Sequence, residues 1–142
     1  MTKPILLDTG PLGMITHPRP NPELFSWLTR MLREGTEVIV PEIMDYELRR
    51  NLLLEGLMDS VGRLDQLKAV LTYLPLSTRT MLRAAALWAQ ARKRGKPTAD
   101  PKELDVDVIL AAQAHEAGGI VVTENAGHLA LFVEARDWRD IR

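Results

Sequence analysis

The chain has 142 residues, a length typical of one domain with a single hydrophobic core. Hydrophobic residues make up 46% of the sequence and charged residues 26%, so the chain is expected to fold rather than to remain disordered. It contains no cysteine, which excludes disulfide bonds, thiolate zinc sites and cysteine nucleophiles, and its formal net charge of −1 argues against polyanion binding over the whole surface.

The N-terminal segment MTKPILLDTG contains an apolar run that is too short for a signal peptide. No later run approaches the roughly 20 apolar residues that are needed to cross a bilayer. We therefore expect a soluble, cytoplasmic protein with no membrane segment, and the absence of cysteine fits a reducing compartment. Any contact with nucleic acid must come from a local basic patch, or from metal ions that offset local acid.

The first half of the chain alternates short apolar runs with segments that carry helix start and stop signals. The apolar run at residues 4–8 predicts a buried strand, and the glycines and prolines of residues 10–22 predict a segment that is mostly loop. The signals that follow predict, in order, a helix over 22–34, a strand at 38–40, a helix over 41–54 and a helix over 58–71.

The second half continues the alternation. Its pattern predicts a brief strand at 72–76, a helix from Ser77 to about Arg94, a polar loop over 95–103, a helix over 105–116, a strand at 120–123, and a tail with a short helix and an edge strand near 131–135. Continuous apolar strands that alternate with helices indicate a parallel sheet covered on both faces. We therefore expect one α/β domain over residues 1–142, a three-layer sandwich whose central, mostly parallel sheet has four to five strands.

Four polar residues fall near the carboxyl ends of the predicted strands, where open parallel sheets bind ligands. Asp8 ends the first strand, and Asn125 follows the last clear strand. Glu47 lies two turns into the helix after the second strand, and Asp107 lies in the first turn of the helix that precedes the last clear strand. We therefore expect these four side chains to meet at one edge of the sheet.

Two of the acids, Glu47 and Asp107, are predicted to lie in largely apolar surroundings, where water cannot solvate a carboxylate fully. Glu47 shares a helical face with residues that we expect to point inward: Ile43, Met44, Asn51 and Leu54. The helix of Asp107, DVDVILAAQAHEAG, is apolar nearly all round. A buried carboxylate is costly unless it is paired or metal-bound. The set therefore predicts a hard divalent cation such as Mg²⁺, which can activate water for attack on a phosphodiester.

Each acid also has a structural interpretation. An Asp at a strand end is more often a cap or turn residue than a ligand. Glu47 has Arg50 three residues further on as an ion-pair partner on the helix surface. Asp105 stands where the N-cap of the last long helix is expected, and we favour that role over the role of an outer metal ligand.

Four segments resemble the PIN-domain family, and in particular its small prokaryotic members, which include the VapC-type toxin ribonucleases. The segments are ILLDTGPLG (5–13), VIVPEIMDYELRR (38–50), LDVDVILAAQA (104–114) and IVVTENAGHL (120–129). They occur in family order at family-like spacing and span almost the whole chain. The resemblance implies a central parallel sheet flanked by helices, with an acidic pocket that binds Mg²⁺ or Mn²⁺.

By motif position, the first three family acids match Asp8, Glu47 and Asp107. The fourth position, commonly Asp, is Asn125, which keeps an oxygen ligand but supplies no charge. Two further residues match hydroxyl positions near the pocket, Thr9 and Thr123. The resemblance implies metal-dependent hydrolysis of RNA, and for a toxin of the VapC type it implies a homodimer and a small antitoxin partner.

Arg92, Lys93 and Arg94 form a basic cluster before the loop that leads to Asp107, which suits contacts with RNA phosphates. The same cations also suit a helix C-terminus through the helix dipole, and the sequence supports the two interpretations equally. Because Asn125 replaces an acid, the alternative function is a weak or inactive PIN-like domain that binds RNA or a protein partner.

Other motifs point elsewhere but fit less of the chain. Asp8-Thr9-Gly10 resembles the active-site triplet of aspartic proteases, whose folds are all-β, whereas this chain has a helix-rich pattern. A haloacid-dehalogenase phosphatase requires Asp where this chain has Gly10. The three histidines lie too far apart in sequence for a zinc motif. His128 follows the Asn125 loop, where it either approaches the pocket or caps a helix, and we favour the cap.

Overall fold

The structure, a computed structural model, describes residues 2–94 and 101–142, without the side chains of 101–103. Its sheet has five strands: β1 (Ile5–Leu7), β2 (Val38–Pro41), β3 (Thr72–Leu74), β4 (Ile120–Val122) and β5 (Ala135–Arg136). The strands lie in the order β3-β2-β1-β4-β5, and all neighbours pair in parallel. The predicted α/β class and the parallel central sheet are therefore confirmed.

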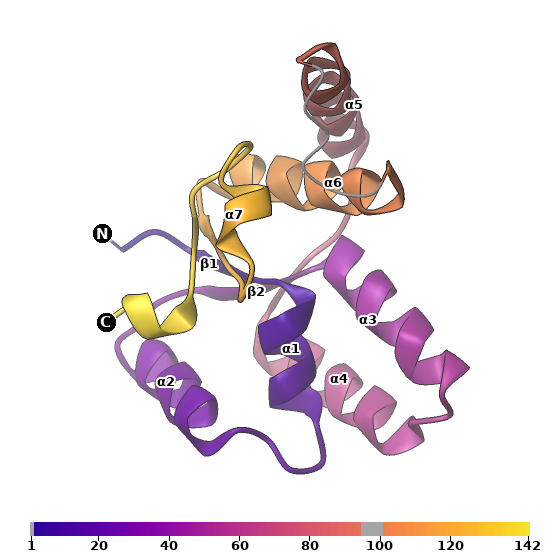
Figure 1. Cartoon of the computed structure of the whole chain (residues 1–142). Helices are drawn as coiled ribbons and strands as arrows, with labels where there is room; N and C mark the ends of the chain where they lie inside the picture. Colours follow the sequence, from indigo (N-terminus) through magenta and orange to yellow (C-terminus); the bar gives the residue numbers. More distant parts are fainter. Residues whose placement is uncertain (1, 95–100) are drawn as a thin grey trace.

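The helices form the outer layers of the sandwich. They are α1 (Thr9–Thr16), α2 (Pro22–Arg33), α3 (Glu42–Leu54), α4 (Met58–Val70), α5 (Thr78–Lys93), α6 (Pro101–Ala117) and α7 (Ala126–Leu129), and a 3-10 turn follows at Trp138–Asp140. Helices α1 to α4 lie on one side of the sheet, and α6 and α7 lie on the other (Figure 1). Helix α5 lies outside α6, so that side is two helices deep.

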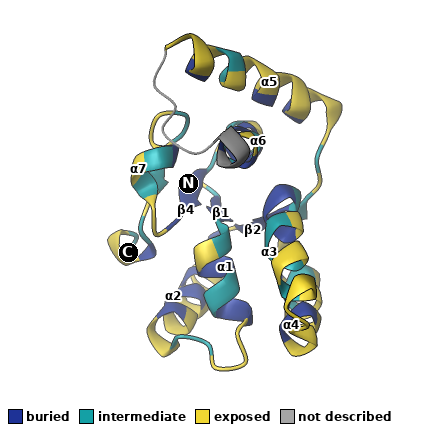
Figure 2. Cartoon of the chain, turned by 45° about the vertical axis from the view of Figure 1, so that its right-hand side comes forward, coloured by how far each residue is buried: buried dark blue, intermediate teal, exposed yellow. Residues whose placement is uncertain are grey.

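Two apolar clusters hold these layers together. The main core surrounds the sheet, and β1, β2 and β4 are buried along their whole length. A second cluster lies between α5 and α6 and contains Ala84, Ala91, Leu104, Val108 and Ala112. The outer face of α5 stays exposed (Figure 2). Among the described residues, none of the helices combines the length and the apolar character that crossing a bilayer requires.

The prediction that residues 10–22 are mostly loop was wrong, because Thr9–Thr16 form helix α1. Asp8 is its N-cap, and Pro11 lies in its first turn, where a backbone N–H has no partner within the helix. A Cβ built on Gly13 lies 3.6 Å from Leu48, so a small residue allows α1 to approach α3 closely. The glycine and proline signals thus mark the start and the packing of a short helix.

Two details of the later helices also differ from expectation. Helix α6 begins at Pro101, which suits the first helical position, so Asp105 lies inside the helix and its predicted N-cap role was wrong. Of the loop predicted over 95–103, residues 95–100 lie outside the described residues. The inward stripe on α3 holds only at its start, because Asn51 is exposed and Leu54 is 85% exposed where the helix projects beyond the sheet (Figure 1).

The approach of Gly119 to β1 gives a test of this packing. A Cβ at Gly119 would lie 2.7 Å from both the carbonyl oxygen of Pro4 and Cδ1 of Leu6. We therefore expect Gly119→Ala to lower the free energy of unfolding by about 1–3 kcal/mol, measured by urea denaturation. Gly62→Ala on α4, where nothing lies within 4 Å, is the control and should raise it by about 0.5–1 kcal/mol. Equal effects of the two variants would contradict the described packing.

Candidate functional site

A cavity of about 260 Å³ lies beyond the carboxyl ends of β1 and β4. In the strand order β3-β2-β1-β4-β5, the chain winds in opposite directions from this pair, so the cavity lies at the topological switch point of the sheet. Its lining contains Asp8, Thr9, Gly10, Glu47, Asp107, Thr123, Glu124, Asn125, His128 and Leu129. The four predicted ligand residues and both predicted threonines therefore surround one cavity.

Asp8 is held by hydrogen bonds from two elements. Its Oδ1 accepts from the backbone N–H of Thr9 at 2.8 Å, and its Oδ2 accepts from the hydroxyl of Thr123 at 2.7 Å. The same hydroxyl oxygen accepts from the backbone N–H of Asn125 at 3.0 Å, and Thr123 is only 1% exposed. Asp8 is thus both the helix cap that we weighed and a cavity residue, and its orientation is fixed by the end of β4.

Asn125 occupies the N-cap position of α7 but makes no side-chain cap hydrogen bond there. Its backbone has φ −131° and ψ 63°, which belong to neither a helix nor a strand. The side chain therefore does not serve the helix that it precedes, and it lines the cavity instead.

Glu47 reaches the cavity from α3, and its side chain is 20% exposed. Its Oε2 lies 3.9 Å from Nη2 of Arg50, so the ion pair that we considered is present at long distance and has small energetic value. Asp107 reaches the cavity from α6 and is half-buried. Glu47 therefore both pairs with Arg50 and lines the cavity, so the two interpretations of this residue do not exclude each other.

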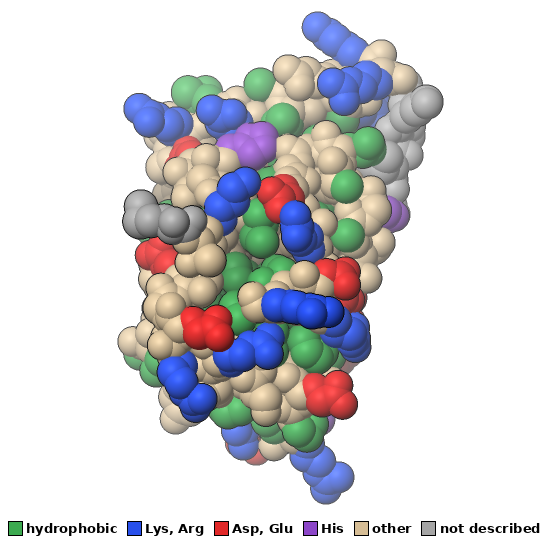
Figure 3. All heavy atoms as spheres, turned by 90° about the vertical axis from the view of Figure 1, so that its left-hand side faces the viewer, with side chains coloured by type: hydrophobic (Ala, Val, Ile, Leu, Met, Phe, Trp, Pro, Cys, Tyr) green, Lys and Arg blue, Asp and Glu red, His purple; other side chains and the backbone are tan. Residues whose placement is uncertain are grey.

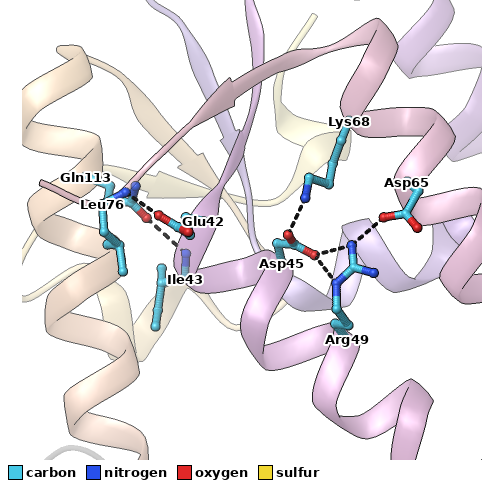
Figure 4. A network of polar contacts seen from close by, with 8 residues as sticks. All are labelled: Glu42, Ile43, Asp45, Arg49, Asp65, Lys68, Leu76 and Gln113. Atoms are coloured by element: carbon cyan, nitrogen blue, oxygen red, sulfur yellow. Dashed lines mark hydrogen bonds and ion pairs between the residues drawn. The ribbon is translucent and has the colours of Figure 1, made fainter.

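An ion-pair network fixes α3, the helix of Glu47, against α4 (Figure 4). Asp45 is 6% exposed and accepts from Arg49 Nε at 2.9 Å and from Lys68 Nζ at 2.7 Å. Arg49 also donates to Asp65 at 2.6 Å. This hydrogen bond is the main cause that raises the pKa of Arg49 and lowers the pKa of Asp65. Of these contacts, Lys68–Asp45 and Arg49–Asp65 join the two helices, whereas Arg49–Asp45 lies within α3.

The structure does not bring every candidate to the cavity. Asp105 is exposed and lines a separate hollow between α5 and α6, beside Met81 and Trp88. The basic cluster at the end of α5 is exposed and does not contribute to the cavity lining: Arg92, Lys93 and Arg94. On the face seen in Figure 3, basic side chains are interspersed with acidic ones and form no continuous basic band among the described residues. A role of the cluster in RNA binding stays a prediction.

Two cavity residues were not assigned to the site from the sequence. Glu124 lies between Thr123 and Asn125, and its Oε2 lies 3.7 Å from the position of a Cβ at Gly10. His128 also lines the cavity and lies inside α7, so the position near the pocket, which we considered but did not favour, is the one observed. Both residues lie close to Asn125 in sequence, and this proximity was the available signal that they belong to the site. It was not sufficient, because strand alternation cannot predict the direction of a side chain once β4 has ended at Val122.

The donor atoms around the cavity suit Mg²⁺ or Mn²⁺, because carboxylate, amide and hydroxyl oxygens predominate in its lining. Among the described residues, no three His, Cys, Asp or Glu side chains are placed to ligate one ion together. Mg²⁺ keeps several water ligands and commonly takes one or two carboxylates directly. The residues therefore fit an ion that some of them contact through water.

Comparisons with known proteins agree with this geometry. The PIN domain profile matches residues 5–131, most of the chain. No curated protein sequence gave a match. Similar solved structures include VapBC2 from Rickettsia felis bound to a DNA fragment from their promoter, with a TM-score of 0.78 and 14% identity over 94% of this chain and 98% of that chain. FitAcB from Neisseria gonorrhoeae has a TM-score of 0.75 and 26% identity over 96% of this chain and 99% of that chain.

A third similar structure is VapBC-1 from nontypeable Haemophilus influenzae, with a TM-score of 0.71 and 16% identity over 96% of this chain and 98% of that chain. Since the profile covers well over half of the chain, the chain belongs to the PIN domain family. Members of this family are generally nucleases that depend on divalent metal ions. The family resemblance stated from the sequence is therefore confirmed.

The hydrogen bond from Thr123 to Asp8 provides a test of the site geometry. Thr123→Val keeps the shape of the side chain but removes the donor to Asp8 and the acceptor for Asn125. We expect it to lower the free energy of unfolding by about 1–3 kcal/mol, because buried polar groups lose their partners. Thr123→Ser keeps the hydroxyl and should lose less than half as much in the same urea titration. Equal losses would show that the hydroxyl makes no difference.

Proposed function

We propose that this chain is a metal-dependent ribonuclease that hydrolyses phosphodiester bonds in RNA. The observation that carries the proposal is the cavity beyond β1 and β4, where acids from separate segments converge: Asp8, Glu47 and Asp107. Asn125 adds a neutral oxygen from a fourth segment. Carboxylates that share one cavity repel one another, and a bound cation would offset that repulsion. RNA as the substrate class is supported by the resemblance to VapC-type ribonucleases.

A bound Mg²⁺ or Mn²⁺ would stabilise negative charge on the phosphate and supply a nucleophilic water. Asp8, Glu47, Asp107 and Asn125 would hold the ion, directly or through water. Thr123 fixes the direction of the Asp8 carboxylate through the 2.7 Å hydrogen bond. Thr9 lies at the cavity wall at the start of α1, where its hydroxyl can hold a water molecule.

We also propose a small antitoxin partner and a homodimer. The VapBC and FitAcB names of the similar structures and the resemblance to VapC-type toxins support the partner. Exposed apolar side chains around the turn between α3 and α4 offer surface for an interaction: Leu53, Leu54, Leu57 and Met58. Such a toxin would act in the cytoplasm, where its RNA substrate is found.

The alternative function is an RNA-binding or protein-binding module without strong catalysis. The observation that favours it is Asn125, which removes one charge from the position where the family commonly has Asp. A binding module should tolerate the loss of one cavity acid, whereas a nuclease should not.

Cleavage assays with paired variants test the nuclease. We expect Asp107→Asn, like Asp8→Asn, to reduce RNA cleavage at least about 100-fold, because loss of a ligand removes several kcal/mol of transition-state stabilisation. Asp105→Asn, on the same helix but outside the cavity, is the matched control and should leave the rate unchanged. EDTA should abolish cleavage, and a DNA strand of the same sequence tests the preference for RNA. Cleavage that survives EDTA and Asp107→Asn would refute the metal-dependent mechanism, whereas RNA binding without cleavage by the parent protein would favour the binding module.

The neutral residue in the lining gives a test of the metal alone. Asn125→Asp should increase Mn²⁺ affinity about tenfold, or about 1.4 kcal/mol, because it adds a charged ligand. Asn51→Asp on α3, exposed and outside the cavity, adds the same charge elsewhere and should have no effect. Calorimetric titration with Mn²⁺ measures the affinity of each variant. If the two variants bind Mn²⁺ equally, position 125 takes no part in the metal site.

A further inference from the structure

Gln113 on α6 is a polar residue outside the cavity that is fully buried, with 0% exposure. Its Oε1 accepts from the backbone N–H of Ile43 at 3.3 Å. Its Nε2 donates to the carbonyl oxygen of Leu74 at 2.8 Å. One amide group therefore connects α6 to the end of β3 and to the first turn of α3, and Figure 4 shows the contact with α3.

The contact with Ile43 replaces a helix cap that α3 cannot make for itself. The N-cap of α3 is Pro41, whose side chain has no acceptor, and no side-chain cap hydrogen bond is present. The first backbone N–H groups of a helix have no partner within the helix, so a buried one requires an acceptor from elsewhere. Gln113 supplies that acceptor from a different helix.

The same junction has a second connection. Oε1 of Glu42, the first residue of α3, accepts from the backbone N–H of Leu76 at 2.6 Å (Figure 4). This bond joins α3 to the chain after β3 but does not involve α6. At this junction, the side chain of Gln113 joins α3 to α6 by a hydrogen bond.

Helices α3 and α6 each carry one acid of the cavity. Ile43 precedes Glu47 by four residues, about 6 Å along α3, and Gln113 follows Asp107 by six residues, about 9 Å along α6. We propose that Gln113 is a positioning residue, which holds α3 and α6 together so that Glu47 and Asp107 face the same cavity. This role rests on the proposed metal-dependent nuclease, and Gln113 itself does not line the cavity.

The test compares the loss of two helix caps. Gln113→Met keeps an unbranched side chain of similar size but removes both hydrogen bonds. Ser77→Ala is the matched control, because Ser77 caps α5 through the backbone N–H of Thr80 at 3.0 Å, and α5 contributes no residue to the cavity. Both variants are first checked for native fold by circular dichroism and urea unfolding.

We expect Gln113→Met to weaken Mn²⁺ binding on the order of tenfold or more and to lower kcat with little change in KM, as losses of supporting groups around metal ligands do. Ser77→Ala should change Mn²⁺ affinity and kcat less than twofold. Native Mn²⁺ affinity in folded Gln113→Met would overturn the positioning role while leaving the proposed nuclease intact. A parent protein that neither binds Mn²⁺ nor cleaves RNA would overturn the proposed function and the positioning role with it.

A measurement without substitution applies even if Gln113→Met does not fold. If the Ile43–Gln113 contact favours metal binding, metal binding must favour the contact by the same factor. Saturating Mg²⁺ should therefore slow hydrogen exchange of the Ile43 amide severalfold more than that of the Thr80 amide, the corresponding cap amide of α5. Equal slowing of the two amides would overturn the proposal.

Discussion

The hydrogen bond between Thr123 and Asp8 is the contact on which the site geometry depends. It follows from the strand register, because Leu7 pairs with Val122 and the next residues of both strands then meet beyond the sheet. The same carboxylate caps α1, so the start of that helix is fixed by the end of β4 as well. A change in register by one residue would separate the two side chains and move the start of α1.

The other two acids reach the cavity on helices, and their positions depend on tertiary contacts rather than on sheet register. Helix α3 is fixed to α4 by the ion pairs Lys68–Asp45 and Arg49–Asp65. It is fixed to α6 and to the chain after β3 by buried or half-buried hydrogen bonds. Charged and polar contacts of this kind specify one arrangement of helices, which apolar packing alone specifies less sharply. The strand-borne half of the site is therefore set by the sheet, and the helix-borne half by these contacts.

The sequence was sufficient for the parts of the fold that depend on local patterns. Short apolar runs between helix caps identified the strands, and their alternation with helices identified a parallel sheet. Helix α1 was missed because its first turn carries Gly10 and Pro11, which usually mark loops, while its cap, Asp8, had been considered chiefly as a ligand. Glu124 and Gln113 were missed for another reason, since the position of each is defined only by contacts with distant segments.

The lining also bears on the neutral residue at the fourth family position. Among the residues that the structure describes, four carboxylates border the cavity: Asp8, Glu47, Asp107 and Glu124. Asn125 directly follows Glu124, so an acid at 125 would place two adjacent carboxylates at the same wall, where like charges disfavour the ionised forms of both. Asparagine keeps an oxygen donor without that repulsion. The neutral residue at 125 is therefore compatible with an acidic cavity, and its presence alone does not argue for a loss of metal binding.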